Sequence, residues 1–447
     1  KLAEFRPALA INPDILARYA ANRLRVVRQV RYSLQNENCL DLVLFLNGLP
    51  VATVELKTDF TQSVRDAIDQ YRHDRLPRPK GGNPEPLLSF PGGALVHFAV
   101  SNTEVAMVTR LRGPETVFLP FNQGDHGAAG NPPLEKSRTG ESRFPSGGPK
   151  SPPNPASGHR TAYLWEQVWA RESWLEILGR YLIAQRDKKR QLTGWIFPRY
   201  HQLDVTRKLQ AAVLRDAEAK TAGKYLIQHS AGSGKTNSIA WTAHFLAELH
   251  DSANRKLFDS VLVVSDRTVI DAQLQDALFD FQRQTGVVAT IKGGEGSKSA
   301  ELAEALSGDK KIVVVTIQTF PFALAAVREL AATQGKRFAV IADEAHSSQT
   351  GEAAAKLKQL LSADEWAALQ DGGEVDTEAL LAAQMEAKSA SKGLTYIAFT
   401  ATPKAKTLEL FGRPGTDGLP QPFHIYSMRQ AIEEGFILDV LQNYTSY

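Results

Sequence analysis

The sequence has 447 residues, of which 43% are hydrophobic and 23% are charged, and its formal net charge at pH 7 is +3. These proportions are ordinary for a globular protein, so they exclude a largely disordered chain and allow two or three domains. The apolar runs are far shorter than the ~18–20 residues of a membrane span, and the net charge is too small to indicate a partner.

Cys39 is the only cysteine of the chain. One cysteine excludes an internal disulfide framework and fits a reducing compartment, and the first residues lack the apolar stretch of a secretory signal. We therefore expect a soluble, intracellular protein that does not bind membranes. The sequence starts without methionine and ends on an alternating stretch, 436–447, that is typical of a strand, so we expect a piece of a longer chain.

The first 120 residues alternate between strand and helix patterns. Strands are expected at 41–46, 51–57, 95–101 and 104–111, and a helix at about 61–75. Residues 120–160 are rich in Gly, Pro, Ser and Asn, a composition that buries little apolar surface and predicts a long surface loop. Beyond it, 161–185 shows helical spacing that includes Trp165, Trp169 and Trp174, and core packing of these rings is favoured over base stacking.

From about residue 195 a strand–loop–helix pattern repeats. The expected strands are 225–229, 260–265, 311–316, 338–342 and 395–400, with helices at 235–249 and 268–281. Short apolar strands that alternate with helices predict a doubly wound parallel sheet, so the fold class is α/β. The Ala-, Glu- and Lys-rich block 351–392 predicts a helical excursion on the surface.

A first candidate site lies in 41-DLVLFLNGLPVATVELK-57. Asp41 opens one strand, Glu55 and Lys57 close the next, and Asn47-Gly48 indicates a hairpin turn. Two carboxylates that hold Mg²⁺ and a lysine that orients or activates water suit phosphodiester hydrolysis. The alternative is an exposed hairpin with scattered charges.

The geometry of this hairpin provides a test. A regular two-residue turn would pair Asp41 with Val54 and leave Glu55 on the opposite face of the sheet. A shared metal site requires a three-residue loop or one bulge, so we predict such an irregularity.

A second candidate site follows a predicted strand and opens a helix, in 229-HSAGSGKT-236. Glycines let backbone N–H groups turn toward phosphates, the lysine reaches the β- and γ-phosphates, and the threonine hydroxyl ligates Mg²⁺. The strict pattern has glycine at the first position, where this chain has His229. The nucleotide ligands expected here are Gly232, Ser233, Gly234, Lys235 and Thr236.

Two further blocks lie at the carboxyl ends of predicted parallel strands. Sheets of this kind bind their ligands at those strand ends. The first is 343-DEAH-346, in which Asp343 is expected to hold the Mg²⁺ shell and Glu344 to polarise the attacking water. The second is 400-TATP-403.

These blocks resemble motifs I, II and III of superfamily 2 helicases and translocases. Upstream, 199-RYHQ-202 is similar to their adenine-reading motif, with Gln202 as the contact to the base, and 265-SDR-267 and 316-TIQTF-320 resemble their nucleic-acid contacts. The resemblance implies ATP and Mg²⁺ as cofactors. It covers one motor lobe, so we expect 1–447 to bind ATP but to hydrolyse it poorly without the lobe that supplies the arginine finger.

The first site resembles the PD-(D/E)XK nuclease motif, with Asp41, Glu55 and Lys57 in its three roles. Gln70, on the helix that follows, resembles the glutamine found after the nuclease core in nucleases attached to motors. That motif has tyrosine four residues later, where this chain has Asp74, so only Gln70 carries over and Tyr71 is a doubtful substitute. A further acidic residue from the N-terminal region is either Glu4 or absent from this piece.

A nuclease followed by a motor on one chain resembles the restriction (motor) subunit of type I restriction-modification enzymes. The stretches 118-FLPFNQG-124, 198-PRYHQLD-204 and 431-AIEEGFILDVLQNYTSY-447 are also similar to that family. The resemblance implies a cytoplasmic bacterial or archaeal protein that joins methyltransferase and specificity subunits, pumps double-stranded DNA with ATP and cuts unmethylated DNA. The alternatives are a free-standing helicase-nuclease of DNA repair or phage defence, and a nuclease-dead ATPase module.

The resemblance also gives the expected domains. Residues 1–160 form a PD-(D/E)XK nuclease domain with its Gly/Pro-rich loop at 120–160, and 161–195 form a helical linker. Residues 196–425 form the first RecA-like ATPase lobe, and 426–447 begin a second, truncated lobe.

Overall fold

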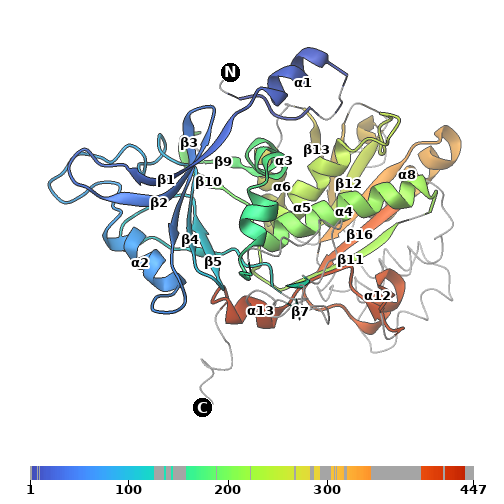
Figure 1. Cartoon of the computed structure of the whole chain (residues 1–447). Coiled ribbons are helices and arrows are strands. Elements are labelled where there is room, and N and C mark those ends of the chain that lie inside the picture. Colours follow the sequence, from blue (N-terminus) through green and yellow to red (C-terminus); the bar gives the residue numbers. More distant parts are fainter. Residues whose placement is uncertain are drawn as a thin grey trace. The chain divides into compact units, whose positions relative to one another are not determined.

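The computed structural model divides the chain into two compact units, Lys1–Leu203 with Arg429–Tyr447, and Asp204–Met428 (Figure 1). The residues that it describes are all except 1–2, 8, 10, 125–134, 137–141, 144–157, 188, 222, 266–267, 282–285, 292–303, 307, 309, 317–319, 344–393, 416–417 and 438–447. No helix in the described ranges is both long and apolar enough to span a membrane. The helical excursion expected at 351–392 and most of the strand expected at 436–447 lie outside those ranges.

The first unit is built on a mixed six-stranded sheet in the order β1-β2-β3-β4-β5-β6. Only β3 and β4 run parallel, and all other neighbours are antiparallel. Its strands are β1 Leu24–Arg31, β2 Cys39–Leu46, β3 Leu49–Leu56, β4 Val96–Val100, β5 Val105–Val108 and β6 Leu119–Pro120. The loop expected at 120–160 contains one described strand pair, β7 Glu135–Lys136 with β8 Ser142–Arg143.

Helix α2, Val64–His73, packs on β3, β4 and β5. It begins with a capping box, because the Ser63 side chain accepts from the helix backbone while the Asp66 carboxylate accepts from the Ser63 N–H. A second helix, α1 Pro13–Ala20, starts with proline after the capping residue Asn12.

The segment expected to be one helix at 161–185 is shorter and interrupted. It consists of a π-helical turn Leu164–Val168, α3 Arg171–Glu176 and a second π-helical turn Ile177–Tyr181, and the chain then enters β9 Ile183–Arg186, which pairs with β10 Leu192–Ile196. Core packing of the tryptophans is confirmed for Trp174, which is 1% exposed and contacts Phe98, whereas Trp165 is 38% exposed.

The second unit has a seven-stranded parallel sheet in the order β13-β14-β12-β15-β16-β11-β19. The predicted parallel α/β architecture is therefore confirmed for this unit. Its strands are β11 Lys224–His229, β12 Ser260–Ser265, β13 Val288–Thr290, β14 Ile312–Thr316, β15 Phe338–Asp343, β16 Leu394–Thr400 and β19 His424–Tyr426. A small hairpin, β17 Arg413–Pro414 with β18 Pro420–Gln421, precedes β19.

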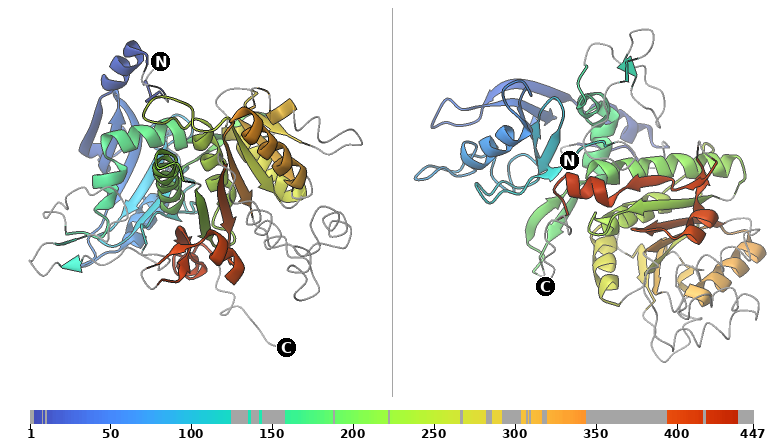
Figure 2. Two further views of the ribbon diagram at one scale, coloured as in Figure 1. Left: turned by 90° about the vertical axis from the view of Figure 1, so that its right-hand side faces the viewer. Right: turned by 90° about the horizontal axis from the view of Figure 1, so that it is seen from below.

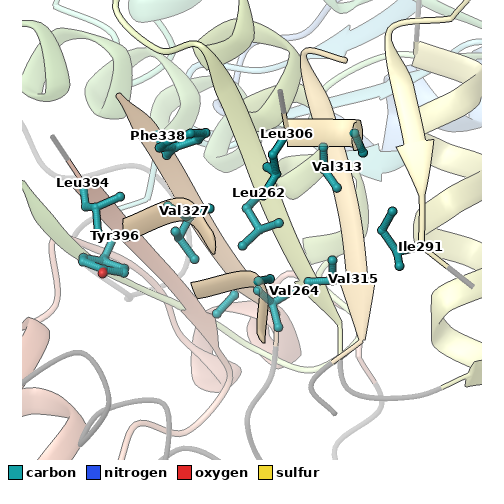
Figure 3. Close-up of a cluster of buried hydrophobic side chains, with 14 of the residues drawn as sticks. Leu262, Val264, Ile291, Leu306, Val313, Val315, Val327, Phe338, Leu394 and Tyr396 are labelled. Atoms are coloured by element: carbon teal, nitrogen blue, oxygen red, sulfur yellow. The ribbon is translucent and has the colours of Figure 1, made fainter. Parts of the chain in front are cut away.

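Alternate residues of the central strands form one continuous apolar cluster. Leu262, Val313 and Phe338 lie in it together with Val327 of helix α8, Phe320–Gln334 (Figure 3). Burial on both faces explains why these strands are apolar throughout. The other helices are α4 Tyr200–Glu218, which crosses the unit boundary, α5 Lys235–Ala247, α6 Thr268–Phe281, α12 Ala405–Phe411 and α13 Met428–Glu433 (Figure 2).

Candidate functional sites

A β-bulge sets the register of the β2–β3 hairpin. The pairing starts with Leu46 opposite Leu49 and reaches Leu42 opposite Val54. Four steps along β2 therefore match five steps along β3, which means that β3 carries one extra residue. The irregularity predicted from the chemistry of the site is confirmed.

This register brings the two predicted carboxylates to one side of the sheet. Continued by one residue, it places Asp41 opposite Glu55. Asp41 is held from two directions, because its Oδ2 accepts from the Leu56 N–H at 2.8 Å and its Oδ1 accepts from the Gln29 amide at 3.0 Å. Sequence reasoning missed Gln29, since β1 was not among the predicted strands.

Glu55 is a buried carboxylate with a cationic partner. It is 1% exposed, and Arg75, just beyond α2, donates from Nε to Glu55 Oε1 at 2.8 Å. A second guanidinium nitrogen of Arg75 donates to the Cys39 carbonyl at 2.9 Å. Burial raises the pKa of Glu55 to about 7; the neighbouring Asp41 also raises it, and Arg75 opposes the shift. No role was predicted for Arg75, which in the structure is the group that holds Glu55.

The donor set fits a hard divalent cation such as Mg²⁺. Two carboxylates face each other and one is buried with a raised pKa, so a cation between Asp41 and Glu55 would stabilise both charges. Groups of three or more His, Cys, Asp or Glu side chains placed to bind a metal do not occur in the part of the chain that the structure describes. A metal here would therefore take its other ligands from water, the backbone or substrate.

Lys57 and Gln70 flank this pair. Lys57 follows β3 directly, and its N–H donates to the Val100 carbonyl at 2.8 Å, which continues the ladder with β4 and keeps Lys57 two residues from Glu55 on an extended strand. Gln70 lies on α2, and its Oε1 is buried without a hydrogen-bond partner among the described residues. A buried amide oxygen of this kind normally has a hydrogen-bond partner, and the described residues do not supply one.

Tyr71, the doubtful substitute for the tyrosine of the family motif, is part of the buried core. It is fully buried, and its hydroxyl lies 2.8 Å from Thr53 Oγ1, which also lies 2.7 Å from Nδ1 of His97. Burial lowers the pKa of His97 to about 3, so this histidine is neutral in the fold. Glu4, the candidate for a further acidic ligand, has its Oε2 3.4 Å from Nε of Arg18 and belongs to no group of three or more such ligands among the described residues.

In the second unit, the loop between β11 and α5 has the backbone that a phosphate requires. Gly232 and Gly234 have φ angles of +74° and +82°, in the region that side chains with a Cβ avoid. Lys235 opens α5, and its ammonium donates to the carbonyls of His229 at 3.2 Å and Ser230 at 3.4 Å. The predicted ligands Ser233 and Thr236 lie on either side of this helix start, and the N-terminus of a helix favours an anion.

His229, which occupies the position of the usual first glycine, belongs to a chain of buried polar contacts. Its Nε2 lies 2.9 Å from Nδ1 of His424, whose Nε2 lies 3.0 Å from Asp204 Oδ2. Asp204 also accepts from Lys208 Nζ at 2.6 Å. Burial works against the Asp204 charge, but hydrogen bonds and charge from His424 and Lys208 lower its pKa to about 2.

Asp343 is the last residue of β15, and Thr400 is the last residue of β16. Because β16 lies between β15 and β11, the carboxyl end of β15 is two strands from the start of the phosphate loop, about 10 Å at normal strand spacing. The structure therefore brings Asp343 to the same sheet edge as the loop. Glu344, Asp266, Arg267 and 317–319 lie outside the described residues.

Gln202 lies in the first turn of α4 and is 3% exposed. Its Oε1 accepts from the Arg199 N–H at 2.9 Å, which fixes the side chain at the helix start. Arg199 pairs with Glu434 at 3.1 Å and stacks on Phe436, so this turn is tied to the segment after α13. The assignment of adenine recognition to Gln202 stays a prediction.

Two family models match the chain, one in each half. Residues 201–446 match the model described as SWI2/SNF2 ATPase, and residues 16–116 match the model described as type I restriction enzyme R protein N terminus. A protein of Methanocaldococcus jannaschii, named as the candidate endonuclease subunit of the type I restriction enzyme MjaVIIIP, is 24% identical over 343 residues. That match covers 73% of this chain but 29% of the relative.

Two solved structures resemble the chain only weakly. One is a nuclease-deletion mutant of the type ISP restriction-modification enzyme LlaGI in complex with a DNA substrate mimic, at 17% identity and a TM-score of 0.31, covering 55% of this chain and 22% of that one. The other is the Hef helicase domain of Pyrococcus furiosus, at 18% identity and a TM-score of 0.26, covering 47% of this chain and 36% of that one. At these scores neither likeness carries an argument about the fold.

Proposed function

Since the chain belongs to the SWI2/SNF2 ATPase family and has the N terminus of a type I restriction enzyme R subunit, we propose that it is the nuclease and first motor lobe of an ATP-dependent restriction endonuclease. The chain spans 29% of the length of the curated relative that it matches, so the activity of a whole enzyme of this kind is part of the proposal. The observation that carries the nuclease half is the bulge in β3, because it aligns Asp41 with Glu55.

In the nuclease site, Asp41 and Glu55 would hold Mg²⁺, which polarises the scissile phosphate when bound. Arg75 fixes the Glu55 carboxylate, and the Leu56 N–H together with the Gln29 amide fixes Asp41. Lys57 would orient or activate the attacking water, and Gln70 would direct its amide at water or at the substrate. These roles give the unit a PD-(D/E)XK type of chemistry.

In the motor site, the phosphates of ATP would lie on the loop N–H groups at the start of α5, with the Lys235 ammonium moving from the two carbonyls to the phosphates. Thr236 and Asp343 would share the Mg²⁺ of the nucleotide. Glu344 would polarise the attacking water, and Gln202 would read the adenine.

In the complete protein, we propose that ATP hydrolysis pumps double-stranded DNA past the complex and that the nuclease cuts unmethylated foreign DNA. Methyltransferase and specificity subunits of a type I complex would be its partners and would supply the target sequence. The runner-up is a free-standing helicase-nuclease of DNA repair or phage defence, which would need no such partners.

The test is plasmid cleavage by the full-length protein with its co-purifying partners, with and without ATP. We expect cutting to require ATP and to be lost in both Lys57→Ala and Lys235→Ala, with ATP hydrolysis kept in the first variant. Cutting that survives Lys57→Ala would remove the nuclease assignment, and cutting without ATP would remove the coupling. Cutting that needs ATP but no partner or target sequence would favour the free-standing enzyme.

A further inference from the structure

Strand β1 is a basic outer edge of the first unit. It forms one end of the six-stranded sheet, with β2 as its neighbour in the sheet order (Figure 1). The run 23-RLRVVRQVRY-32 has four arginines and no acidic residue. All four arginine side chains are exposed: Arg23, Arg25, Arg28 and Arg31.

These arginines are available to a charged partner. Across the described residues, Arg25 and Arg28 form no ion pair, and Arg31 pairs with Glu37 where both side chains are largely exposed, at 68% and 78%. An exposed pair of this kind is weak and exchanges readily for another anion. From Arg25 to Arg31 the strand runs about 20 Å, long enough to follow several phosphates of a duplex.

Gln29 connects this strand to the candidate nuclease site. Its backbone has a φ of +49°, a conformation that residues other than glycine rarely adopt. The β1–β2 ladder is regular on both sides of it, with Arg28 opposite Leu42 and Val30 opposite Leu40. The local distortion therefore lies where the Gln29 amide donates to Asp41, and strain of this kind gathers at functional sites.

We propose that β1 binds the phosphate backbone of duplex DNA and guides the strand to be cut toward Asp41. This rests on the proposed nuclease function and adds the surface that holds its substrate. The four arginines supply the charge complementarity, and the contact of Gln29 with Asp41 places that charge beside the metal ligands.

A protein partner added to the edge as a further strand is the competing occupant, because Val26 and Val27 are 60% and 41% exposed. Two features disfavour it. Strand addition needs a regular row of backbone groups, and the φ of Gln29 interrupts that row. The high positive charge of the edge also repels a second copy of the same strand.

The experiment measures binding of a labelled duplex of unrelated sequence to the 1–447 chain at several salt concentrations, with Ca²⁺ in place of Mg²⁺ to prevent cutting. For Arg25→Ala/Arg28→Ala we expect roughly tenfold weaker binding and a slope of log affinity against log salt that is smaller by about 2, since each lost phosphate contact removes about 0.9. Arg25→Lys/Arg28→Lys keeps the charge and should keep most of the slope.

The matched control is Arg18→Ala/Arg160→Ala, which removes two exposed arginines of the same unit that lie outside β1. It should leave the slope unchanged. An unchanged slope in the β1 variant, or the same loss in the control, overturns the proposal. If DNA binding is unchanged while self-association measured by sedimentation is lost, β1 is a protein edge instead.

The proposed nuclease function is tested by a different variant. In the full-length protein, Lys57→Ala should abolish plasmid cutting. If the β1 variant binds normally and Lys57→Ala still abolishes cutting, the DNA surface is wrong and the nuclease stands. If Lys57→Ala cuts, the nuclease assignment is wrong whatever β1 binds.

Discussion

The two units position their candidate sites by different means. In the second unit, the phosphate loop and Asp343 follow the carboxyl ends of parallel strands, so the topology of the sheet alone brings them to one edge. In the first unit, Asp41 and Glu55 face each other only because β3 carries one extra residue, and a buried arginine then holds Glu55 in place. One site follows from the order of the strands and the other depends on their register.

The difference has consequences for stability. The first site concentrates ionisable groups in a buried layer, with Glu55, Arg75 and His97 all less than 10% exposed. The phosphate loop instead relies on glycine backbone angles and a helix start, which bury no carboxylate. We therefore expect the first unit to respond more strongly to pH and to single charge changes.

The largest expected effect is acid unfolding of the first unit through His97. Its pKa is about 3 in the fold and 6.5 in the unfolded chain, so the folded state resists protonation. The associated stability is present above pH 6.5 and is lost as the pH falls toward 3, by up to about 5 kcal/mol at 1.36 kcal/mol per pKa unit. Glu55 acts in the opposite direction, because its raised pKa of about 7 favours its protonation in the fold and so offsets part of this loss between pH 7 and 4.5. Calorimetry between pH 7 and 3 should therefore show the transition temperature of the first unit falling further in the unmodified 1–447 chain than in a variant without His97.

His97→Gln is the control variant for this prediction, because glutamine can still contact Thr53 but does not titrate. Its first unit should be less stable at pH 7 and should lose less stability on acidification. In the second unit, the carboxylate Asp204 has its pKa lowered from 3.8 to about 2, so its contribution is lost only as the pH falls through that lower range. Equal acid sensitivity of the two transitions would contradict the comparison.

Next in size is the loss of the cation that faces Glu55. Arg75→Ala leaves a buried carboxylate without its partner, and breaking a buried pair costs about 3–5 kcal/mol. Arg65 lies on the same helix with an exposed side chain that forms no ion pair with the described residues, so Arg65→Ala should cost less than about 1 kcal/mol. Urea unfolding of the two variants measures the difference, and similar losses would mean that the Glu55 pair contributes little.

The sequence predicted the second unit better than the first for a physical reason. Parallel strands are apolar throughout and their ligands follow them directly, so strands such as 260–265 were predicted with their observed bounds. Strand β1 was missed because arginines interrupt its alternation, and with it Gln29 was missed. Arg75 could not be assigned to Glu55, since the pair joins residues 20 apart through tertiary packing.

The bulge in β3 was predicted from the chemistry of the site and not from residue propensities. Propensity gave a hairpin at Asn47-Gly48, and only the requirement that Asp41 and Glu55 share a face demanded an extra residue, which the structure contains. The helix expected through 185 ended at Tyr181, since periodicity does not reveal the pairing of β9 with β10. Glu344 lies outside the described residues, so its role stays a prediction.

In the same calorimetric experiment, ATP should change the transition temperature of the second unit more than that of the first. A ligand at 100 times its Kd stabilises the state that binds it by about 2.7 kcal/mol, so Mg²⁺ and ATP should raise the transition temperature of the second unit, which holds the phosphate loop. Lys235→Ala should remove most of that shift, because the ammonium opposite the phosphates is lost. A normal shift in Lys235→Ala would contradict the assignment of the nucleotide to this loop.

The smallest effect concerns the contacts behind the phosphate loop. Asp204→Asn removes the charge that His424 and Lys208 face, and hydrogen bonds to charged groups contribute about 1.5–3 kcal/mol, so we expect the second unit to lose about 2 kcal/mol. His424 would then no longer be held against His229, and ATP affinity should fall several-fold because that strand end leads into the loop. Lys208→Ala removes only the more exposed partner and should cost less than about 1 kcal/mol with unchanged ATP affinity. Equal losses of stability in the two variants would mean that Asp204 stabilises the unit mainly through Lys208. Unchanged ATP affinity in Asp204→Asn would mean that the contacts from Asp204 through His424 to His229 do not affect the phosphate loop.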